Sequence, residues 1–323
     1  MSPTWTVRVL AAAAVAVVGW CAVTAWPAVV HGHPSYAALL GATLVVAVTA
    51  GALTLRGPAP DRRRRAPRDP GRAVIARRLG GVALALVVVG WLGLLGWLRP
   101  FSAVEPAPSA MVSDAAVTVT DSATRIILRP VTGATGTGIV FQPGARVEAR
   151  AYAAALRPLA EAGTLVVVPK QPLGIGFLAA GAFESARADH PEVERWVVGG
   201  HSLGGTVASL DAAAHGSGDD GDAPLVGLVL WASYPASDLS RTLTGEVLSV
   251  SADGDGLATP ADIEASRADL PQDTTFVVVP GAVHASFGDY GPQPGDGTPT
   301  LDPDEARRQI TGATLTFLDD LPR

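Results

Sequence analysis

The residues best suited to chemistry lie in the stretch from Trp196 to Leu210, Trp-Val-Val-Gly-Gly-His-Ser-Leu-Gly-Gly-Thr-Val-Ala-Ser-Leu. An apolar run that predicts a β-strand enters the pattern G-x-S-x-G, and a run that predicts a helix follows it. A serine on so sharp a turn needs neighbours without a Cβ, which Gly200 and Gly204 supply. The pattern is typical of a serine nucleophile, here Ser202, standing above a sheet. The alternative is a turn kept for folding in a protein that has lost its chemistry.

A serine nucleophile needs a base, and His284 is the histidine best placed to act as one. The other five lie in the N-terminal apolar region, at the ends of predicted helices or inside the turn: His31, His33, His190, His215 and His201. His284 follows the last predicted strand on a loop, from which its imidazole can reach Ser202 over the edge of a sheet. The chain order Ser, Asp, His is one of the known orders of a catalytic triad.

The acid of such a triad should follow the preceding strand, where the segment from Val247 to Pro260 offers Asp253 and Asp255. We favour Asp255, because it leads through Gly and Leu into a predicted helix start. Asp253 then serves as a turn residue and remains the alternative acid. A calcium loop is excluded, because Leu257 stands where a ligand is needed and Ala258 where glycine is required. We expect no metal and no cofactor.

Apolar runs alternate with helical stretches after residue 116, which predicts an α/β fold with a doubly wound, mostly parallel sheet. Ligands of such sheets bind at the carboxyl ends of the strands. The predicted strands are Val117–Leu128, Gly138–Gln142, Thr164–Pro169, Arg195–Gly199, Leu225–Trp231, Glu246–Ser251 and Thr274–Val279. The predicted helices are Ala151–Ala162, Leu178–Asp189, Leu203–His215, Pro260–Leu270 and Asp304–Leu318.

Three apolar runs, at about 6–30, 36–55 and 79–98, are each long enough to cross a bilayer as a helix. The sole cysteine, Cys21, lies inside the first of them, so no intrachain disulfide can form. Residues 1–99 are therefore predicted to be a membrane region with three transmembrane helices. Residues 100–116, rich in Pro, Ala and Ser, are predicted to be a linker, and 117–323 a single domain.

Charge is distributed unevenly along the chain. Residues 1–99 carry 11 basic and two acidic residues, whereas residues 100–323 carry 13 basic and 28 acidic ones. Nine arginines lie between Arg56 and Arg78, separating the second apolar run from the third. A nucleic-acid patch is one interpretation of that cluster, but a short basic loop between two spans more simply follows the positive-inside rule. The loop is then cytoplasmic, and everything after Arg99 lies outside the cytoplasm of the cell, with no nucleic-acid partner.

The segment from Val117 onward resembles the α/β-hydrolase superfamily, and particularly its small cap-less branch similar to dienelactone hydrolases. Five pieces carry the resemblance: Phe141-Gln-Pro-Gly144-Ala145-Arg-Val147, Val168-Pro-Lys170-Gln-Pro-Leu173, Gly200-His-Ser-Leu-Gly-Gly205, Asp255-Gly-Leu257 and His284-Ala-Ser-Phe-Gly-Asp-Tyr-Gly291. Dienelactone hydrolases use a cysteine nucleophile, whereas this chain has Ser202 at the turn. Their substrate is therefore not carried over.

The resemblance implies an oxyanion hole made by the Leu203 N–H and an N–H of the Gly144-Ala145 turn. It also implies a Ser202, His284, Asp255 triad that cleaves a small-molecule carboxylic ester through an acyl-enzyme. The whole chain is then predicted to be a membrane-anchored serine hydrolase whose first region contacts the lipid bilayer. The alternative is a catalytically inactive binding or sensory membrane protein that retains the fold.

Overall fold

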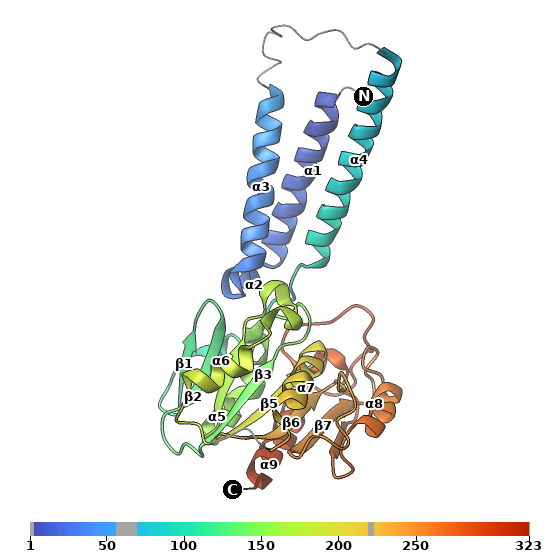
Figure 1. The fold of residues 1–323 in the computed structure, drawn as a ribbon. Coiled ribbons are helices and arrows are strands. Elements are labelled where there is room, and N and C mark those ends of the chain that lie inside the picture. Colours follow the sequence, from blue (N-terminus) through green and yellow to red (C-terminus); the bar gives the residue numbers. More distant parts are fainter. Residues whose placement is uncertain (1–2, 56–69, 219–222, 323) are drawn as a thin grey trace. The chain divides into compact units, whose positions relative to one another are not determined.

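The computed structural model describes residues 3–55, 70–218 and 223–322, which form two compact units (Figure 1). One unit comprises Met1–Val30 and Pro34–Arg99, and the other comprises His31–His33 and Pro100–Arg323. Apart from residues 31–33, the division falls between Arg99 and Pro100. Basic residues outnumber acidic ones before this position, and acidic residues outnumber basic ones after it.

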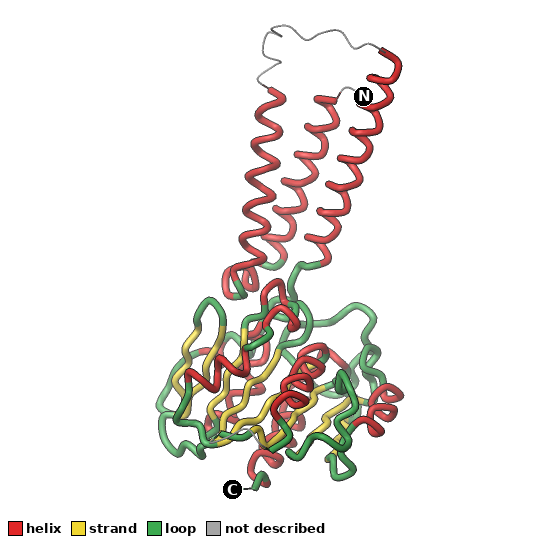
Figure 2. The backbone as a smooth tube through the Cα atoms, in the orientation of Figure 1, coloured by secondary structure: helices red, strands yellow, loops and turns green. Residues whose placement is uncertain are grey.

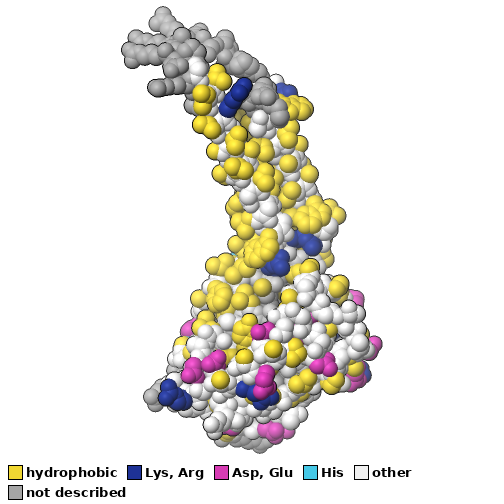
Figure 3. All heavy atoms as spheres, turned by 90° about the vertical axis from the view of Figure 1, so that its right-hand side faces the viewer, with side chains coloured by type: hydrophobic (Ala, Val, Ile, Leu, Met, Phe, Trp, Pro, Cys, Tyr) yellow, Lys and Arg dark blue, Asp and Glu magenta, His cyan; other side chains and the backbone are white. Residues whose placement is uncertain are grey.

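The first unit is helical. Its elements are α1 (Pro3–Thr24), α2 (Trp26–His31), α3 (Pro34–Leu55) and α4 (Pro70–Trp97). Three segments are long and apolar enough to cross a membrane: Thr4–Thr24, Pro34–Leu55 and Arg78–Trp97. Hydrophobic side chains cover most of the visible surface of these long helices, with few Lys or Arg among them (Figure 3). The arginine-rich loop falls largely on residues 56–69, which lie outside the described residues.

The first predicted span, at about 6–30, is not one continuous helix. The helix is interrupted at Ala25, between the end of α1 and the start of α2. Pro27 accounts for the break, because it has no N–H to donate and its ring would clash with the Val23 carbonyl of a continuous helix. The first membrane-spanning candidate therefore ends at Thr24, and the second and third lie close to the predicted runs.

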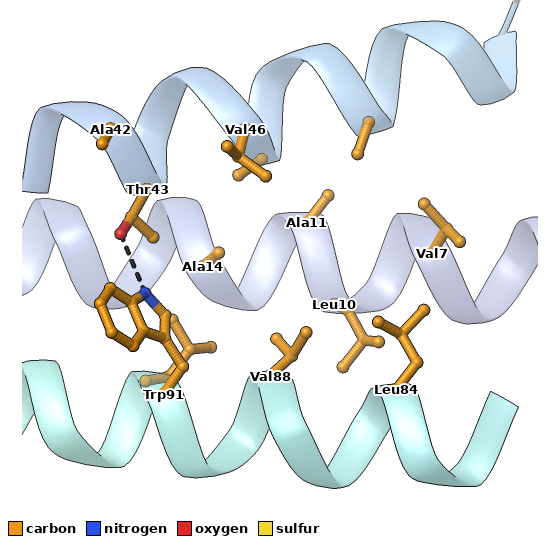
Figure 4. Close-up of a pocket in the computed structure, with 13 residues that line it drawn as sticks. Val7, Leu10, Ala11, Ala14, Ala42, Thr43, Val46, Leu84, Val88 and Trp91 are labelled. Atoms are coloured by element: carbon orange, nitrogen blue, oxygen red, sulfur yellow. Dashed lines mark hydrogen bonds between the residues drawn. The ribbon is translucent and has the colours of Figure 1, made fainter. Parts of the chain in front are cut away.

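Polar side chains between the long helices are paired. The Arg8 guanidinium donates to the Thr54 carbonyl (2.8 Å) and hydroxyl (3.1 Å), and the Trp91 indole N–H donates to the Thr43 hydroxyl (3.0 Å). Such pairing matters because an unsatisfied polar group in an apolar environment costs several kcal/mol. Around the Trp91 bond, a cavity of about 350 Å³ is otherwise lined by apolar side chains (Figure 4), among them Leu10, Val46, Leu84 and Val88.

The second unit is built on one eight-stranded sheet (Figure 2). Its strands are β1 (Val117–Asp121), β2 (Arg125–Pro130), β3 (Thr137–Gln142), β4 (Leu165–Pro169), β5 (Arg195–His201), β6 (Leu225–Trp231), β7 (Glu246–Ala252) and β8 (Thr275–Val279). They lie in the order β1-β2-β4-β3-β5-β6-β7-β8. The pairs β1–β2 and β2–β4 are antiparallel and all others are parallel, which confirms the predicted mostly parallel α/β sheet.

Helices cover both faces of the sheet, as a doubly wound fold requires. The helices are α5 (Ala153–Glu161), α6 (Ala182–Asp189), α7 (Leu203–His215), α8 (Pro260–Ser266) and α9 (Pro303–Asp320). Side chains of β3 alternate between two hydrophobic clusters, because successive residues of a strand point to opposite faces. Ile139 and Phe141 join the cluster that includes α5 and α9, whereas Val140 joins the cluster that includes α6 and α7.

The predicted strand 117–128 is in fact two strands of an antiparallel hairpin, β1 and β2. The turn lies around Ser122, whose hydroxyl donates to the Arg125 carbonyl (2.8 Å) and accepts from the Arg125 N–H (3.1 Å). Serine favours turns for this reason, since its side chain replaces a backbone hydrogen-bond partner. The apolar residues on both sides of this short turn concealed it in the sequence.

Residues 100–116, which their composition predicts to be a linker, pack onto the second unit. Phe101 pairs with Val147 in an isolated bridge, and the Val104 N–H donates to the Asp289 carbonyl (2.8 Å). The Ala103 N–H donates to the Glu148 carboxylate (2.8 Å). Burial of small apolar side chains, together with these backbone bonds, orders a segment that its Pro and Ser content alone would leave extended.

The turn from β5 to α7 approaches the end of β3 very closely. A Cβ added to Gly204 would lie 2.1 Å from the Gln142 carbonyl oxygen and 2.4 Å from that of Pro143. A Cβ added to Gly200 would lie 2.4 Å from the Gly204 carbonyl carbon. All three distances are far below van der Waals contact, and the atoms met are backbone. The two glycines of the G-x-S-x-G pattern are therefore required by packing.

This packing predicts a large loss of stability for Gly204→Ala. The added methyl group must displace backbone, so we expect a cost on the order of 3 kcal/mol or more, measured by thermal or denaturant unfolding. Gly312→Ala is the matched control, because Gly312 lies inside α9 and a Cβ there would meet nothing within 4 Å. It should be neutral or stabilise by up to about 1 kcal/mol. Equal stabilities of the two variants would contradict this account.

Candidate active site

Ser202 occupies the turn between β5 and α7 in a strained conformation. Its φ of 54° and ψ of −128° lie outside the regions that residues with a Cβ ordinarily adopt, at a cost on the order of 1–3 kcal/mol. The Ser202 N–H donates to the Trp231 carbonyl (2.9 Å), and the Ser202 carbonyl accepts from the Ser233 hydroxyl (2.7 Å). These bonds hold a partly exposed serine at the carboxyl end of a central strand.

Asp255 and His284 form a buried pair. They follow β7 and β8, which are neighbours in the sheet, and Asp255 Oδ2 lies 2.8 Å from His284 Nδ1. The other carboxylate oxygen, Oδ1, accepts from the N–H groups of Leu257 (2.7 Å) and Ala258 (2.8 Å). The carboxylate is thus oriented from its own loop. Because an ionised carboxylate only accepts hydrogen bonds, His284 donates from Nδ1.

The other ring nitrogen of His284 is available for chemistry. Nε2 is buried and has no hydrogen-bond partner among the described residues. The His284 ring lies 4.6 Å from the ring of His201, the residue directly before Ser202. The Ser202 hydroxyl likewise forms no hydrogen bond with any residue that the structure describes. The structure therefore joins Asp255 to His284 directly and brings His284 beside the residue that precedes Ser202.

Asp253 has a different partner. Its Oδ1 accepts from the Gly281 N–H (2.7 Å) and so links the loop after β7 to the turn after β8. The two carboxylates therefore have different partners, because Asp255 bonds the His284 ring and Asp253 bonds a backbone N–H. Within residues 3–55, 70–218 and 223–322, no group of three His, Cys, Asp or Glu side chains is placed to hold a metal ion.

Asp296 is a residue that sequence reasoning missed. Its carboxylate accepts from the N–H groups of His284 (3.1 Å), Ala285 (2.8 Å) and Gly256 (3.2 Å). It therefore fastens the loop that carries His284 to the loop that carries Asp255. The surrounding Gly and Pro residues predict only a loop, and no pattern in the sequence indicates that this carboxylate reaches back to the histidine.

Two backbone N–H groups near Ser202 are free of acceptors. Leu203 is the first residue of α7, so its N–H has no acceptor within the helix. Neither Leu203 nor Ala145 donates its N–H to any described residue. The Gly144 N–H, in contrast, donates to the Tyr152 hydroxyl (2.8 Å). Of the two donors that the Gly144-Ala145 turn offers, only the Ala145 N–H remains available.

Tyr152 connects this turn to the imidazole before Ser202. Its hydroxyl accepts from the Gly144 N–H (2.8 Å) and forms a second hydrogen bond with His201 Nδ1 (2.9 Å). Burial, with a smaller contribution from the charge of His284, lowers the pKa of His201 well below its ordinary value. Burial likewise raises the pKa of the Tyr152 hydroxyl. Burial thus favours the neutral form of both groups and makes His201 a weaker base than an ordinary histidine.

Gln171 supports the same turn from the loop after β4. Its buried side-chain amide donates to the Gln142 side-chain carbonyl (3.1 Å) and to the Pro143 backbone carbonyl (3.0 Å). The position of the Gly144-Ala145 turn is thus determined from two sides, by Tyr152 and by Gln171. Both residues lie far from Ser202 in the sequence, which explains why sequence reasoning did not single them out.

Comparison with known proteins shows the family of this chain. Among solved structures, a putative dienelactone hydrolase from Klebsiella pneumoniae subsp. pneumoniae is 18% identical with a TM-score of 0.49, covering 63% of this chain and 98% of that one. A butyrate-bound thermophilic esterase from Thermogutta terrifontis is 13% identical with a TM-score of 0.45, covering 64% and 94%. The comparison with curated proteins gave no match. Residues 138–308, more than half of the sequence, match the model of the alpha/beta hydrolase family, and the chain therefore belongs to this family.

Proposed function

We propose that this chain is a membrane-anchored serine hydrolase that cleaves a carboxylic ester through an acyl-enzyme. One observation carries the proposal. A buried Asp255–His284 pair leaves His284 Nε2 without a partner among the described residues, beside a strained turn that presents Ser202. A carboxylate that orients an imidazole next to a serine is the arrangement that activates a hydroxyl nucleophile.

The proposed reaction uses each group in turn. His284 Nε2 takes the proton of the Ser202 hydroxyl as the oxygen attacks the ester carbonyl, and Asp255 stabilises the imidazolium through Nδ1–H. When the tetrahedral intermediate collapses, the imidazolium gives this proton to the departing alcohol. Water then attacks the acyl-enzyme with His284 again as the base, which releases the acid and restores the Ser202 hydroxyl.

The free N–H groups of Leu203 and Ala145 support an oxyanion hole. Both have no acceptor among the described residues, and both follow the carboxyl ends of adjacent strands, β5 and β3. Donors fixed in advance stabilise the negative charge that develops on the carbonyl oxygen, and loss of one such donor typically costs about 100-fold or more in rate. Gly144 then acts on the oxyanion hole indirectly, through its bond to Tyr152.

Replacing the nucleophile tests the proposal. Full-length Ser202→Ala in detergent should hydrolyse p-nitrophenyl acetate at least about 1000-fold more slowly than the wild type, because no acyl-enzyme can form. A fluorophosphonate probe should label the wild type and not the variant. Ser185→Ala, which changes an exposed serine of α6, is the matched control and should behave as the wild type. Full activity of Ser202→Ala would exclude the mechanism.

The two acidic residues are distinguished by a pair of asparagine variants. Asp255→Asn should lower kcat by up to about 10⁴-fold with little change in KM, because the carboxylate no longer holds the reactive imidazole tautomer. Asp253→Asn should stay within about tenfold, since an asparagine oxygen can still accept from the Gly281 N–H. Steady-state kinetics on both proteins measure the difference. A reversed order would assign the triad acid to Asp253.

The membrane anchor and its orientation belong to the same proposal. Three helices with the length and composition of membrane spans support the anchor. The arginine-rich segment between the second and third apolar runs supports a cytoplasmic loop by the positive-inside rule. Because one span, the third, lies between this loop and the hydrolase unit, the unit is then on the extracytoplasmic side.

Reporter fusions test this orientation. A reporter enzyme that is active only outside the cytoplasm should be active when fused after Arg323 and inactive when inserted after Pro67. A reporter that works only in the cytoplasm should give the opposite pattern at the same two positions, which controls for poor expression. Activity of the first reporter at Pro67 and not at Arg323 would place the hydrolase unit in the cytoplasm.

A further inference from the structure

Four large apolar side chains are exposed on segments that follow the central strands. Phe177 is 52% exposed, Leu178 54%, Tyr234 42% and Leu257 37%. Phe177 and Leu178 come after β4, Tyr234 after β6 and Leu257 after β7. Because these strands are parallel to β5, their carboxyl ends share one edge of the sheet with Ser202. We call these four side chains the apolar rim.

The segment that carries Phe177 and Leu178 is fastened to the proposed oxyanion turn. The Arg146 N–H, one residue after Ala145, donates to the Gly174 carbonyl (2.7 Å). Gly176 approaches α7 so closely that an added Cβ would lie 2.9 Å from Val207 Cγ2. The first part of the rim therefore lies between the turn that offers the Ala145 N–H and the first turns of the helix after Ser202.

Tyr234 and Leu257 are tied to the other catalytic groups. The hydroxyl of Ser233, which precedes Tyr234, donates to the Ser202 carbonyl (2.7 Å), and the Thr206 hydroxyl donates to the Tyr234 carbonyl (3.1 Å). The Leu257 N–H donates to Asp255 Oδ1 (2.7 Å). Each member of the rim is thus one or a few residues away from a group that contacts the nucleophile turn, the oxyanion turn or the triad acid.

We propose that the apolar rim binds the hydrocarbon part of the substrate, so that the enzyme prefers esters with an alkyl chain of several carbons. The inference rests on the proposed ester hydrolysis and adds the substrate class to it. Single exposed apolar residues are ordinary on protein surfaces, but four on loops at the edge of the sheet that carries Ser202 favour an apolar ligand at that edge. Each methylene that leaves water is worth about a fourfold gain in kcat/KM.

The test compares two esters on the full-length protein in one detergent. We expect kcat/KM for p-nitrophenyl octanoate to exceed that for the acetate by about tenfold or more. The double variant Phe177→Ser with Leu178→Ser should reduce this ratio about tenfold. Partition of octanoate into micelles is the same for both proteins and cancels in the comparison. The matched control changes Val131 and Val278 to serine, which are 49% and 55% exposed, and should keep the wild-type ratio.

A second measurement does not depend on hydrolysis. An inert octyl ketone with a photoactivatable diazirine should label peptides containing residues 175–179 or 233–235 in Ser202→Ala, and the Phe177, Leu178 double change should reduce that labelling about tenfold. The inference is overturned if the Phe177, Leu178 double change leaves the ester ratio unchanged, or if it leaves the labelling as high as the Val131, Val278 control does. The rim would then bind another apolar partner, such as a second copy of the chain. Failure of the proposed function is separate, because it shows as activity that persists in Ser202→Ala.

Discussion

The close approach of the β5–α7 turn to the end of β3 is the contact on which the candidate site depends. Gly204 packs against the carbonyl groups of Gln142 and Pro143 at a distance that excludes any side chain. The same contact sets the separation between the Leu203 N–H, at the start of α7, and the Ala145 N–H, just after β3. The Gln171 side-chain amide also donates to the Pro143 carbonyl. Two backbone donors from distant parts of the chain are therefore positioned by one rigid contact.

Much of the α/β fold was predictable because most of its strands are short, largely apolar runs bounded by turn residues. β6 and α7 have the predicted bounds, and most other elements differ by one to three residues at either end. The errors have local causes. A three-residue polar turn divides β1 from β2, Pro27 ends the first long helix, and residues 100–116 are ordered by tertiary contacts that composition does not report.

The candidate site likewise contains residues that sequence patterns indicated and residues that they did not. The positions of Ser202, His284 and Asp255 at the carboxyl ends of strands were predictable because each follows a recognisable apolar run in the sequence. Tyr152, Gln171 and Asp296 were not, since each acts through hydrogen bonds to backbone groups that no sequence pattern identifies. Their residue types are common in ordinary loops and helices. Only the folded chain shows which backbone groups they hold.

The Tyr152 hydroxyl also separates the environments of two neighbouring histidines. This hydroxyl accepts from the Gly144 N–H and is hydrogen-bonded to His201 Nδ1, and burial lowers the pKa of His201. The His201 and His284 rings lie 4.6 Å apart, yet their partners differ. His284 is joined to the Asp255 carboxylate, whereas His201 contacts a hydroxyl, so the surroundings favour a positive charge on only one of the two imidazoles that border the serine.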